Sequence, residues 1–433
     1  MKTKISQRLN RVVIFAILCV GMISITQNLF SAMSKPGQNN DTASFITLSG
    51  KITDKETSKP LMYANIYIVG TSIGTVANAE GEFLLKVPKE REKEMLGAKH
   101  LGYKAFSNSI EKLKNSTIKI ELEQEVIPLQ EIIIRTDDPL TLLRSALSNV
   151  RKNYRNSPTM VTSFYREAIQ QNHKYVSIAE AVLETYKTSY TDYFSDDKVK
   201  VLIGRKGQDV KRMDTIVVKM QGGPVVPFYL DVARNPDALF SDDNIKYYDF
   251  SLKGQTSLDN ERCYMIEFSQ RPVENMALYK GVIYIEVQTL AIVGLEFSIS
   301  DYGLPFASNL FIKKKPLTMR VNILNANYFV RYAKANGFWN LSYVRSEMGF
   351  KCKWKQKFFS STYKTMIEMA VTNIDTVKVE RYKSKETFKQ SEIFSDKADD
   401  FKNDEFWGDY NIIKPDESIQ NAIEKLSKKL KKK

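Results

Sequence analysis

The sequence predicts a mainly β protein: a small β-sandwich, then a helix and a large antiparallel sheet, and finally an amphipathic helix. Short alternating stretches separated by Gly, Pro and Asn turns fill residues 50–87, which is typical of a small sandwich. Longer stretches rich in Tyr, Phe, Val, Ile and Thr run from about residue 160 to 379 and favour strands. Apolar residues recur at helical spacing over residues 419–430. A chain of 433 residues can hold two or three such domains.

Residues 1–34 are expected to be a signal peptide. An apolar run from Val12 to Ile25 follows a basic start and precedes small residues at Ala32 and Ser34, as in an export signal. Because the run is short for a transmembrane helix, we favour cleavage over a retained N-terminal anchor. Cleavage removes four basic and no acidic residues, so the net charge falls from +14 to +10. The four are Lys2, Lys4, Arg8 and Arg11.

A set of landmarks defines the sandwich expected over residues 46–135. The opening strand Gly50-Lys51-Ile52-Thr53-Asp54 is followed by Pro60-Leu61 and by Ala64 to Ile68. The turn Gly70-Thr71-Ser72-Ile73-Gly74-Thr75 comes next, and Asn78 stands before Gly81-Glu82-Phe83. These landmarks resemble those of the carboxypeptidase-regulatory-like, or prealbumin-like, domain. The later Gly102-Tyr103 and the strand Leu129 to Ile134 are similar to the closing segment of that family.

The resemblance implies a binding or spacer module that carries no catalytic residues. Domains of this family accompany zinc carboxypeptidases and also stand at the N-terminus of TonB-dependent outer-membrane receptors and other envelope proteins. For this chain it therefore implies a fold for residues 46–135 and a place in the cell envelope, but no reaction.

Residues 138–395 are expected to form a helix and then a large antiparallel sheet. Asp138 suits the N-cap and Pro139 the first helical position. About ten strands follow, among them Ser163 to Glu167, Tyr175 to Val182, Cys263 to Phe268, Lys280 to Val287, Ala291 to Ile299, Phe338 to Tyr343, Gly349 to Lys355 and Lys364 to Ile374. Residues 221–247 interrupt this rhythm with Gly222-Gly223-Pro224 and are expected to be an insertion or a lid-like loop.

Two features of this domain leave alternatives open. The strand rhythm from Cys263 to Val293 resembles that of periplasmic lipoprotein-carrier half-barrels, whose sheet wraps around a cavity for acyl chains. The alternative is a curved sheet with an ordinary packed core. Cys263 and Cys352 both lie in strand-like stretches, where an oxidising compartment permits a disulfide and two buried free thiols are the other choice.

Residues 396–433 form a separate C-terminal feature in this interpretation. The aromatic cluster from Phe406 to Tyr410 precedes Pro415 and an amphipathic helix that ends in lysines. Its apolar stripe consists of Ile419, Ala422, Ile423, Leu426 and Leu430. Such a helix can lie on an anionic membrane surface, or it can dock on its own domain with its lysines in solvent, which we favour.

The sequence assigns no catalytic, cofactor-binding or metal-binding residue. His100 and His173 are the two histidines, and neither stands in a pattern that a zinc peptidase requires. Gly70 to Gly74 fits G-x-S-x-G, but a nucleophile elbow at Ser72 needs a strand-to-helix turn, and here it joins two strands. Glu180 and Glu184, together with Glu167, lie in expected strands, where solvated or ion-paired carboxylates are the preferred interpretation over a glycosidase pair.

The most consistent function is that of a non-enzymatic, exported protein of a Gram-negative envelope, in the periplasm or associated with the outer membrane. Its partner would be a lipid, a glycan or an envelope protein, and its C-terminal basic helix offers a contact with a membrane surface. An exported protein is not expected to meet nucleic acid, despite the basic excess. The alternatives are a small outer-membrane β-barrel related to the TonB-dependent receptors and a hydrolase without a recognisable motif. No cofactor is expected.

Overall fold

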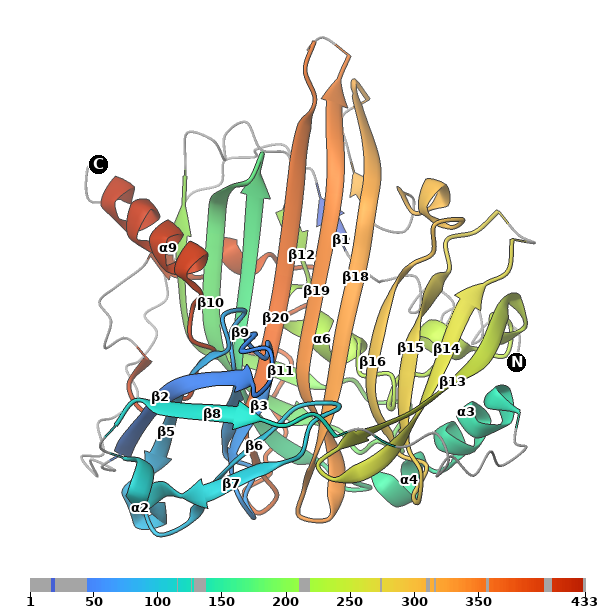
Figure 1. Cartoon of the computed structure of the whole chain (residues 1–433). Helices are drawn as coiled ribbons and strands as arrows, with labels where there is room; N and C mark the ends of the chain where they lie inside the picture. The colour runs from blue at the N-terminus through green and yellow to red at the C-terminus, as the bar shows by residue number, and fades with distance from the viewer. Residues whose placement is uncertain are drawn as a thin grey trace.

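The computed structural model describes residues 17–19, 45–114, 116–125, 127, 138–209, 219–272, 275–308, 312–314, 317–355, 358–400 and 407–430. Within them a small sandwich lies against one face of a large sheet (Figure 1). The fold class expected from the sequence is therefore confirmed. Nearly all of the expected signal peptide and the expected strand Leu129 to Ile134 lie outside the described residues. In the described part of the chain, every helix is too short or too polar to cross a bilayer.

The sandwich consists of a three-stranded sheet, in the order β5-β2-β8, and a four-stranded sheet, in the order β4-β3-β6-β7. Side chains that alternate along these strands fill one core, which includes Ile52, Ile66 and Phe83. The strands are β2 Phe45–Asp54, β3 Asn65–Ile68, β4 Gly74–Val76, β5 Glu82–Pro88, β6 Met95–Lys99, β7 Phe106–Ser109 and β8 Ile118–Leu122, with the short helices η1 Lys89–Arg91 and α2 Ile110–Leu113.

The structure explains why Gly50 and Asp54 stand in the opening strand of the sandwich. A Cβ atom at Gly50 would lie 2.1 Å from the carbonyl oxygen of Ile118, so only glycine permits the close parallel pairing of β2 with β8. The Asp54 carboxylate accepts hydrogen bonds from the backbone of Thr57, from the Tyr103 hydroxyl at 2.7 Å and from Gln124 Nε2 at 2.9 Å. These bonds lower the pKa of Asp54 and fasten the first strand to the later part of the domain.

The large sheet has eleven strands in the order β13-β14-β15-β16-β18-β19-β20-β9-β10-β11-β21. All neighbours are antiparallel except β11 and β21. The strands are β9 Thr159–Gln171, β10 Lys174–Lys187, β11 Lys198–Gln208, β13 Tyr248–Leu258, β14 Glu261–Gln270, β15 Tyr279–Glu286, β16 Ile292–Ile299, β18 Met319–Ala335, β19 Phe338–Trp354, β20 Ser361–Asp375 and β21 Asp399–Asp400. A smaller sheet joins β1 Ile17–Cys19 to β12 Lys219–Gln221 and β17 Ile312–Lys314.

The sheet differs from the sequence expectation in two respects. The expected strands Phe338 to Tyr343 and Gly349 to Lys355 merge, apart from Lys355, into one long strand, β19, and its partner β18 was not among the expected strands. The sheet is also open, with β13 at one edge and β21 at the other. The described strands therefore do not form the closed sheet that one of the alternative functions requires.

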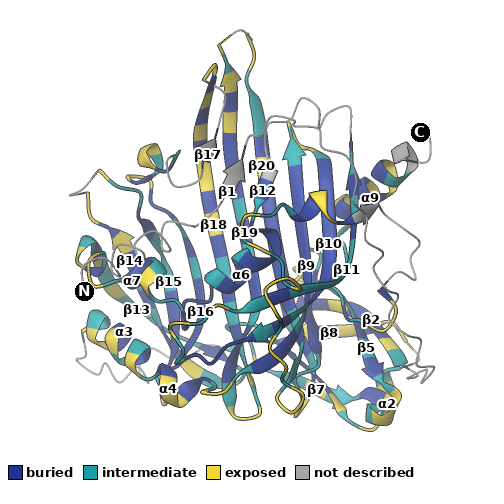
Figure 2. Ribbon diagram, turned by 180° about the vertical axis from the view of Figure 1, so that it is seen from behind, coloured by how far each residue is buried: buried dark blue, intermediate teal, exposed yellow. Residues whose placement is uncertain are grey.

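The expectation of a lid-like loop at residues 221–247 is wrong, because this segment packs into the core. We call the face of the sheet that carries Tyr165 and Phe268 the inner face. Leu230, Leu239 and Phe240 are buried against it, and α6 and α7 lie across it (Figure 2). The helical elements of this segment are η3 Gly223–Val225, α6 Val226–Tyr229, α7 Asp237–Phe240 and η4 Ile245–Tyr247.

A buried ion pair fixes that segment to the sheet. Asp231 accepts from Lys187 Nζ at 2.7 Å and from the Tyr332 hydroxyl at 2.9 Å, so the carboxylate has partners on β10 and β18. The inner face is thus filled by the chain itself, which corresponds to the packed-sheet alternative.

The predicted helix after the sandwich is present in two pieces, α3 Pro139–Ser148 and α4 Val150–Asn153. The Asp138 side chain accepts from the Thr141 backbone N–H at 3.2 Å and caps α3, as expected. Leu142 and Leu143 are buried in the large core.

Cys263 and Cys352 are both buried free thiols, which is the second of the two alternatives. The strand register gives the reason. Cys263 lies on the same face as Glu267, which is the outer face, whereas Cys352 lies on the face opposite to Glu347. Two side chains on opposite faces of one sheet cannot meet the geometry of a disulfide.

A row of alternating charges crosses five neighbouring strands on the outer face. The register places Arg205, Glu180, Arg166, Glu368 and Arg345 directly opposite one another on β11, β10, β9, β20 and β19. We call these five residues the charge row. Arg166 binds Glu180 and Glu368 at 2.7 Å each, Arg205 binds Glu180 at 2.7 Å, and Arg345 binds Glu368 at 3.0 Å. Burial opposes ionisation of Glu180, yet Arg166 and Arg205 hold its pKa below the usual value.

The C-terminal segment covers this row. Residues 407–416, which we call the strap, run between the sheet and the sandwich. Arg166 Nη2 donates to the carbonyl of Ile413 at 2.9 Å, and the Arg205 guanidinium lies 4.7 Å from the Trp407 ring centroid. Helix α9 Glu417–Leu430 follows. Its apolar residues, including Ile419 and Ile423, pack on the sheet in a cluster with Ile178, so the stripe is docked, as we favoured.

The sandwich is attached both to the strap and to the sheet. Asn411 Oδ1 accepts from the backbone of Lys86 at 2.7 Å, and Lys414 pairs with Glu82 at 2.7 Å. At the other side of the sandwich, the nearly buried Lys99 ammonium lies 2.7 Å from Asp259 in the β13–β14 turn. The sandwich therefore spans one end of the outer face.

We predict that Arg166→Met lowers the free energy of unfolding by about 3–5 kcal/mol, because it leaves buried carboxylates without their shared cation. Denaturant unfolding followed by tryptophan fluorescence measures this. The control is Lys364→Met, which removes a half-exposed cation from Glu347 and should cost less than about 1 kcal/mol. Equal effects of the two substitutions would contradict a special role of the row.

Candidate functional site

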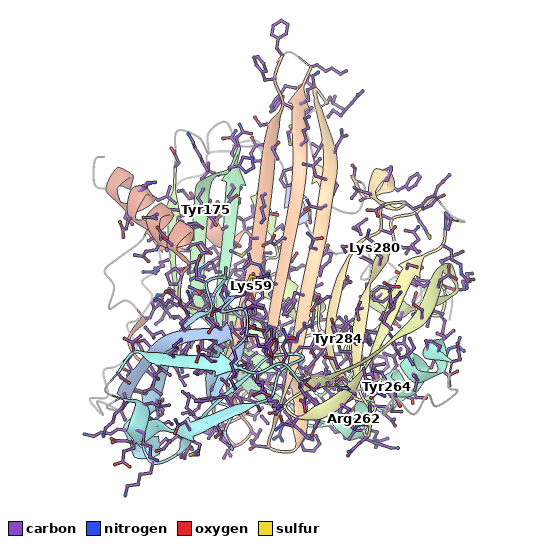
Figure 3. All side chains as sticks on the ribbon, viewed as in Figure 1. Lys59, Tyr175, Arg262, Tyr264, Lys280 and Tyr284 are labelled. Atoms are coloured by element: carbon purple, nitrogen blue, oxygen red, sulfur yellow. The ribbon has the colours of Figure 1, made fainter. Side chains whose placement is uncertain are left out.

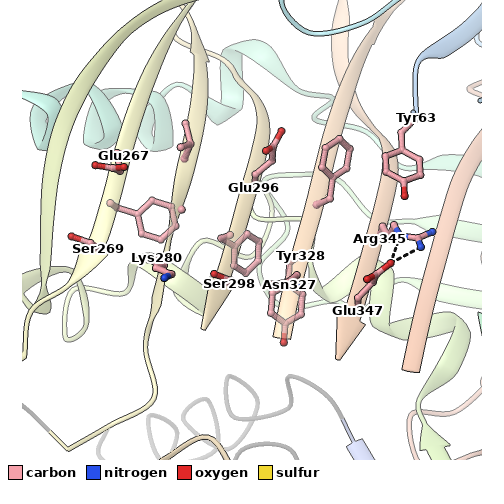
Figure 4. A pocket seen from close by; sticks show the side chains of 15 residues that line it. Tyr63, Glu267, Ser269, Lys280, Glu296, Ser298, Asn327, Tyr328, Arg345 and Glu347 are labelled. Atoms are coloured by element: carbon pink, nitrogen blue, oxygen red, sulfur yellow. Dashed lines mark hydrogen bonds and ion pairs between the residues drawn. The ribbon is translucent and has the colours of Figure 1, made fainter. Parts of the chain in front are cut away.

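A hollow lies on the outer face of the sheet, beside the sandwich. It is a trough of about 640 Å³ over strands β14 to β19, with Tyr63 of the sandwich at one side (Figure 4). Its volume falls within the range of ligand sites in proteins. Lys280 lies at the end of this region away from the sandwich, and Tyr284 lies closer to it (Figure 3).

The strand register supplies the floor of the trough as two rows of side chains. One row continues the charge row beyond Arg345, through Phe329, Glu296, Val282 and Glu267. The second row lies one pair further along each strand and consists of Glu347, Asn327, Ser298, Lys280 and Ser269. Because alternate residues of a strand face the same side, both rows point into the trough.

Aromatic rings form the wall next to the sandwich. The Tyr63 ring lies 5.2 Å from that of Tyr343, stacked, and 5.5 Å from that of Phe329. The Arg345 guanidinium lies 5.2 Å from the Tyr63 centroid. Burial raises the pKa of Tyr63 to about 12, so its hydroxyl remains protonated and can donate a hydrogen bond.

Tyr63 also has an unusual backbone conformation. Its φ of 61° lies in the left-handed region, which is unfavourable for a bulky residue. Its N–H donates to the carbonyl of Ala77 at 3.2 Å, so the turn of the sandwich holds the residue in place. Backbone strain of this kind concentrates at functional positions, and here it directs an aromatic ring to the edge of the trough.

The charged side chains around the trough already have partners of opposite sign. Glu267 pairs with Lys253 at 2.7 Å, and Lys280 pairs with Asp301 at 2.5 Å. Glu296 pairs with Arg331. Glu347 binds both Arg345 at 2.5 Å and Lys364 at 2.7 Å. The trough therefore presents hydroxyl, amide and carboxylate atoms without an uncompensated charge.

Ser72 forms hydrogen bonds between the sandwich and the large sheet. Its hydroxyl lies 2.8 Å from Asn373 Oδ1 and accepts from the Ile374 N–H at 3.1 Å. The G-x-S-x-G segment connects β3 with β4 and has no strand-to-helix turn, so the interpretation as a sandwich turn stands.

Neither histidine lies in a cluster of three metal-binding side chains within the part of the chain that the structure describes. Burial lowers the pKa of His100, whose ring packs edge-on against Tyr103, while His173 lies in the turn between β9 and β10. Among the described residues, no three metal-binding side chains come together.

The three carboxylates considered in the sequence lie apart from one another. Glu180 belongs to the charge row, and Glu184 accepts from the Tyr382 hydroxyl. Glu167 is on the inner face, 2.7 Å from the Tyr165 hydroxyl, where burial raises its pKa to about 7. The ion-paired interpretation holds for Glu180, but the site residues of the trough were not found from the sequence.

Comparison with known proteins bears on the sandwich. Residues 48–134 match the model of the family described as CarboxypepD_reg-like domain, which confirms the resemblance stated for this part of the chain. No curated protein matches the chain. A solved structure of a DUF1329 family protein from Desulfovibrio piger is 16% identical and covers 56% of this chain and 96% of its own, with a TM-score of 0.23.

We predict that Glu167→Gln changes the pH dependence of stability. The folded protein keeps the Glu167 proton up to a pH of about 7, whereas an ordinary carboxyl loses it near 4.5. The free energy of unfolding therefore falls as the pH rises through this window and stays lower above it. The variant has no such proton, so it should match the wild type at pH 4 and exceed it at pH 8 by up to about 3 kcal/mol.

Urea unfolding at the two pH values measures the difference. Glu424→Gln, on the exposed side of α9, serves as the control. Its free energy of unfolding should differ from that of the wild type by the same small amount at both pH values. A Glu167→Gln variant that is no more stable than the wild type at pH 8 would contradict the buried, protonated carboxyl.

Proposed function

We propose that the protein is a non-enzymatic binding protein of the cell envelope and that the trough holds an uncharged, polyhydroxylated ligand, that is, a glycan. The sandwich acts in this proposal as the wall of the site and as a spacer. The trough supports this proposal because it combines a hollow of about 640 Å³ with aromatic rings and convergent polar groups.

The ion pairs around the trough are the reason for proposing an uncharged ligand. A charged ligand would have to displace Lys253, Asp301, Arg331 or Lys364 from their present partners, which costs the energy of those pairs. A neutral ligand needs no such exchange, because its hydroxyls can donate to the unused lone pairs of Glu267, Glu296 and Ser298. The rings of Tyr63 and Phe329 are half-buried and line the trough, and their remaining apolar surface suits the C–H face of a sugar ring.

Other partners from the sequence have less support. A lipid in a half-barrel would need the inner face, and Leu230, Val232 and Phe240 already occupy it. An envelope protein could use the same trough, and the experiment below separates it from a glycan. A hydrolase would need a catalytic pair, but the three carboxylates considered for that role lie apart. Export rests on the basic and apolar segments of residues 1–34 and is supported by the match of the sandwich.

We predict that the protein binds neutral oligosaccharides and that Ser298→Trp weakens this binding at least tenfold, because the indole would fill the floor of the trough. Isothermal titration calorimetry with neutral maltohexaose, cellohexaose and hexa-N-acetylchitohexaose, against acidic alginate oligomers, measures the preference. Ser116→Trp places the same side chain on an exposed position of the sandwich and should leave the affinity unchanged.

Two results would contradict the proposal. One is the absence of binding to every neutral oligosaccharide tested, and the other is equal binding by Ser298→Trp and the wild type. Loss of an envelope protein from pull-downs with Ser298→Trp, without saccharide binding by the wild type, would assign the trough to a protein partner instead.

A further inference from the structure

The most exposed apolar side chains gather at one end of the molecule. Among the described large apolar residues, Leu317, Phe358 and Phe359 have the highest exposed fractions, 98%, 95% and 89%. Phe358 and Phe359 lie between β19 and β20, and Leu317 lies just before β18. The backbone N–H of Lys355 donates to the carbonyl of Thr318 at 2.8 Å, so the two segments meet. We call this group of three residues the apolar tip.

The apolar tip stands away from the rest of the fold. Strands β18, β19 and β20 extend beyond the neighbouring strands, and the tip is at their end (Figure 1). Buried apolar side chains are the norm for Phe and Leu, and single exposed ones need no explanation. Three at the end of a projecting structure are exposed together, which indicates a contact with an apolar partner.

The charges around the apolar tip are of one sign. Arg320, Lys351 and Lys353 are exposed and share the outer face, because the strand register places Arg320 opposite Lys353 and Lys351 two residues before it. Lys355 is exposed beside them. The sequence contains no Asp or Glu between Met348 and Ile367 or between Ile312 and Asn325. The nearest carboxylates of β19 and β20, Glu347 and Glu368, lie further from the tip along these strands, and Glu347 pairs with Lys364.

We propose that the apolar tip inserts into the surface of an anionic lipid membrane, with the surrounding lysines on the headgroups. Aromatic and leucine side chains enter the headgroup and acyl-chain boundary, and basic residues add attraction to anionic lipids. The charge complementarity favours a membrane over a protein patch, since an anionic lipid surface can contact both the apolar end and the cations beside it. The proposed membrane contact does not depend on which ligand the trough binds.

The location differs from the membrane contact considered in the sequence. The apolar stripe of α9 is buried on the sheet and cannot enter a bilayer without leaving it. The apolar tip has no such cover among the described residues, so no rearrangement is needed for it to bind.

The test is co-sedimentation of the full chain with vesicles of phosphatidylcholine alone and of phosphatidylcholine with about 30% phosphatidylglycerol, which supplies a negatively charged surface. The wild type should bind the anionic vesicles and release in high salt. Phe358→Ser/Phe359→Ser should lower the partition coefficient at least tenfold. Lys353→Gln and Lys355→Gln should each lower it about fivefold.

Phe194→Ser is the matched control, because Phe194 is also exposed but lies in a loop of the other half of the sheet, and it should leave binding unchanged. A Phe358→Trp variant adds a direct readout, since its fluorescence should be quenched by brominated lipids. Equal binding by the double serine variant and the wild type, no binding to anionic vesicles, or absence of quenching would each overturn the proposal. The substituted positions are exposed, and an unchanged melting temperature verifies that the variants are folded.

Discussion

The charge row on the outer face is the constraint on which the rest of the structure depends. Five alternating charges on five strands satisfy one another through Arg166 at the centre, but such groups remain ionised away from water only if every lone pair and proton finds a partner. The sheet alone would leave this row in solvent. The strap covers it and contributes the carbonyl of Ile413, and the sandwich closes over the strap through Asn411 and Lys414.

The trough follows from this arrangement. The row of facing residues does not stop at Arg345 but continues through Phe329 and Glu296 to Glu267. Where the strap and the sandwich cover it, the row is structural. Where the cover ends, at Tyr63, the same row becomes the floor of an open hollow. The sheet thus uses one register for stability on one half and, in the proposed function, for ligand binding on the other, while its inner face is occupied by the segment around Asp231 and Leu239.

Much of the fold could be predicted from the sequence, since its signals are local. The turn residues from Gly50 to Phe83, the cap at Asp138 and the apolar stripe of α9 each act within a few residues, and all three are present. The strap, the packed segment around Leu230 and the trough could not be predicted, because they depend on which strands are neighbours. Glu296 and Arg345 are 49 positions apart in the chain, and only the pairing of β16, β18 and β19 brings them to one hollow.

The central claim is that the sandwich sits on the sheet as a cover, and a cross-link tests it most directly. Ser72 Oγ and Asn373 Oδ1 are 2.8 Å apart across the boundary between the domains, whereas the native thiols Cys263 and Cys352 are buried. The account predicts that Ser72→Cys/Asn373→Cys forms a disulfide under mild oxidation and that its two introduced thiols then no longer react with maleimide. The introduced thiol of each single variant should remain reactive. Full labelling of both introduced thiols without a cross-link would contradict the docked sandwich.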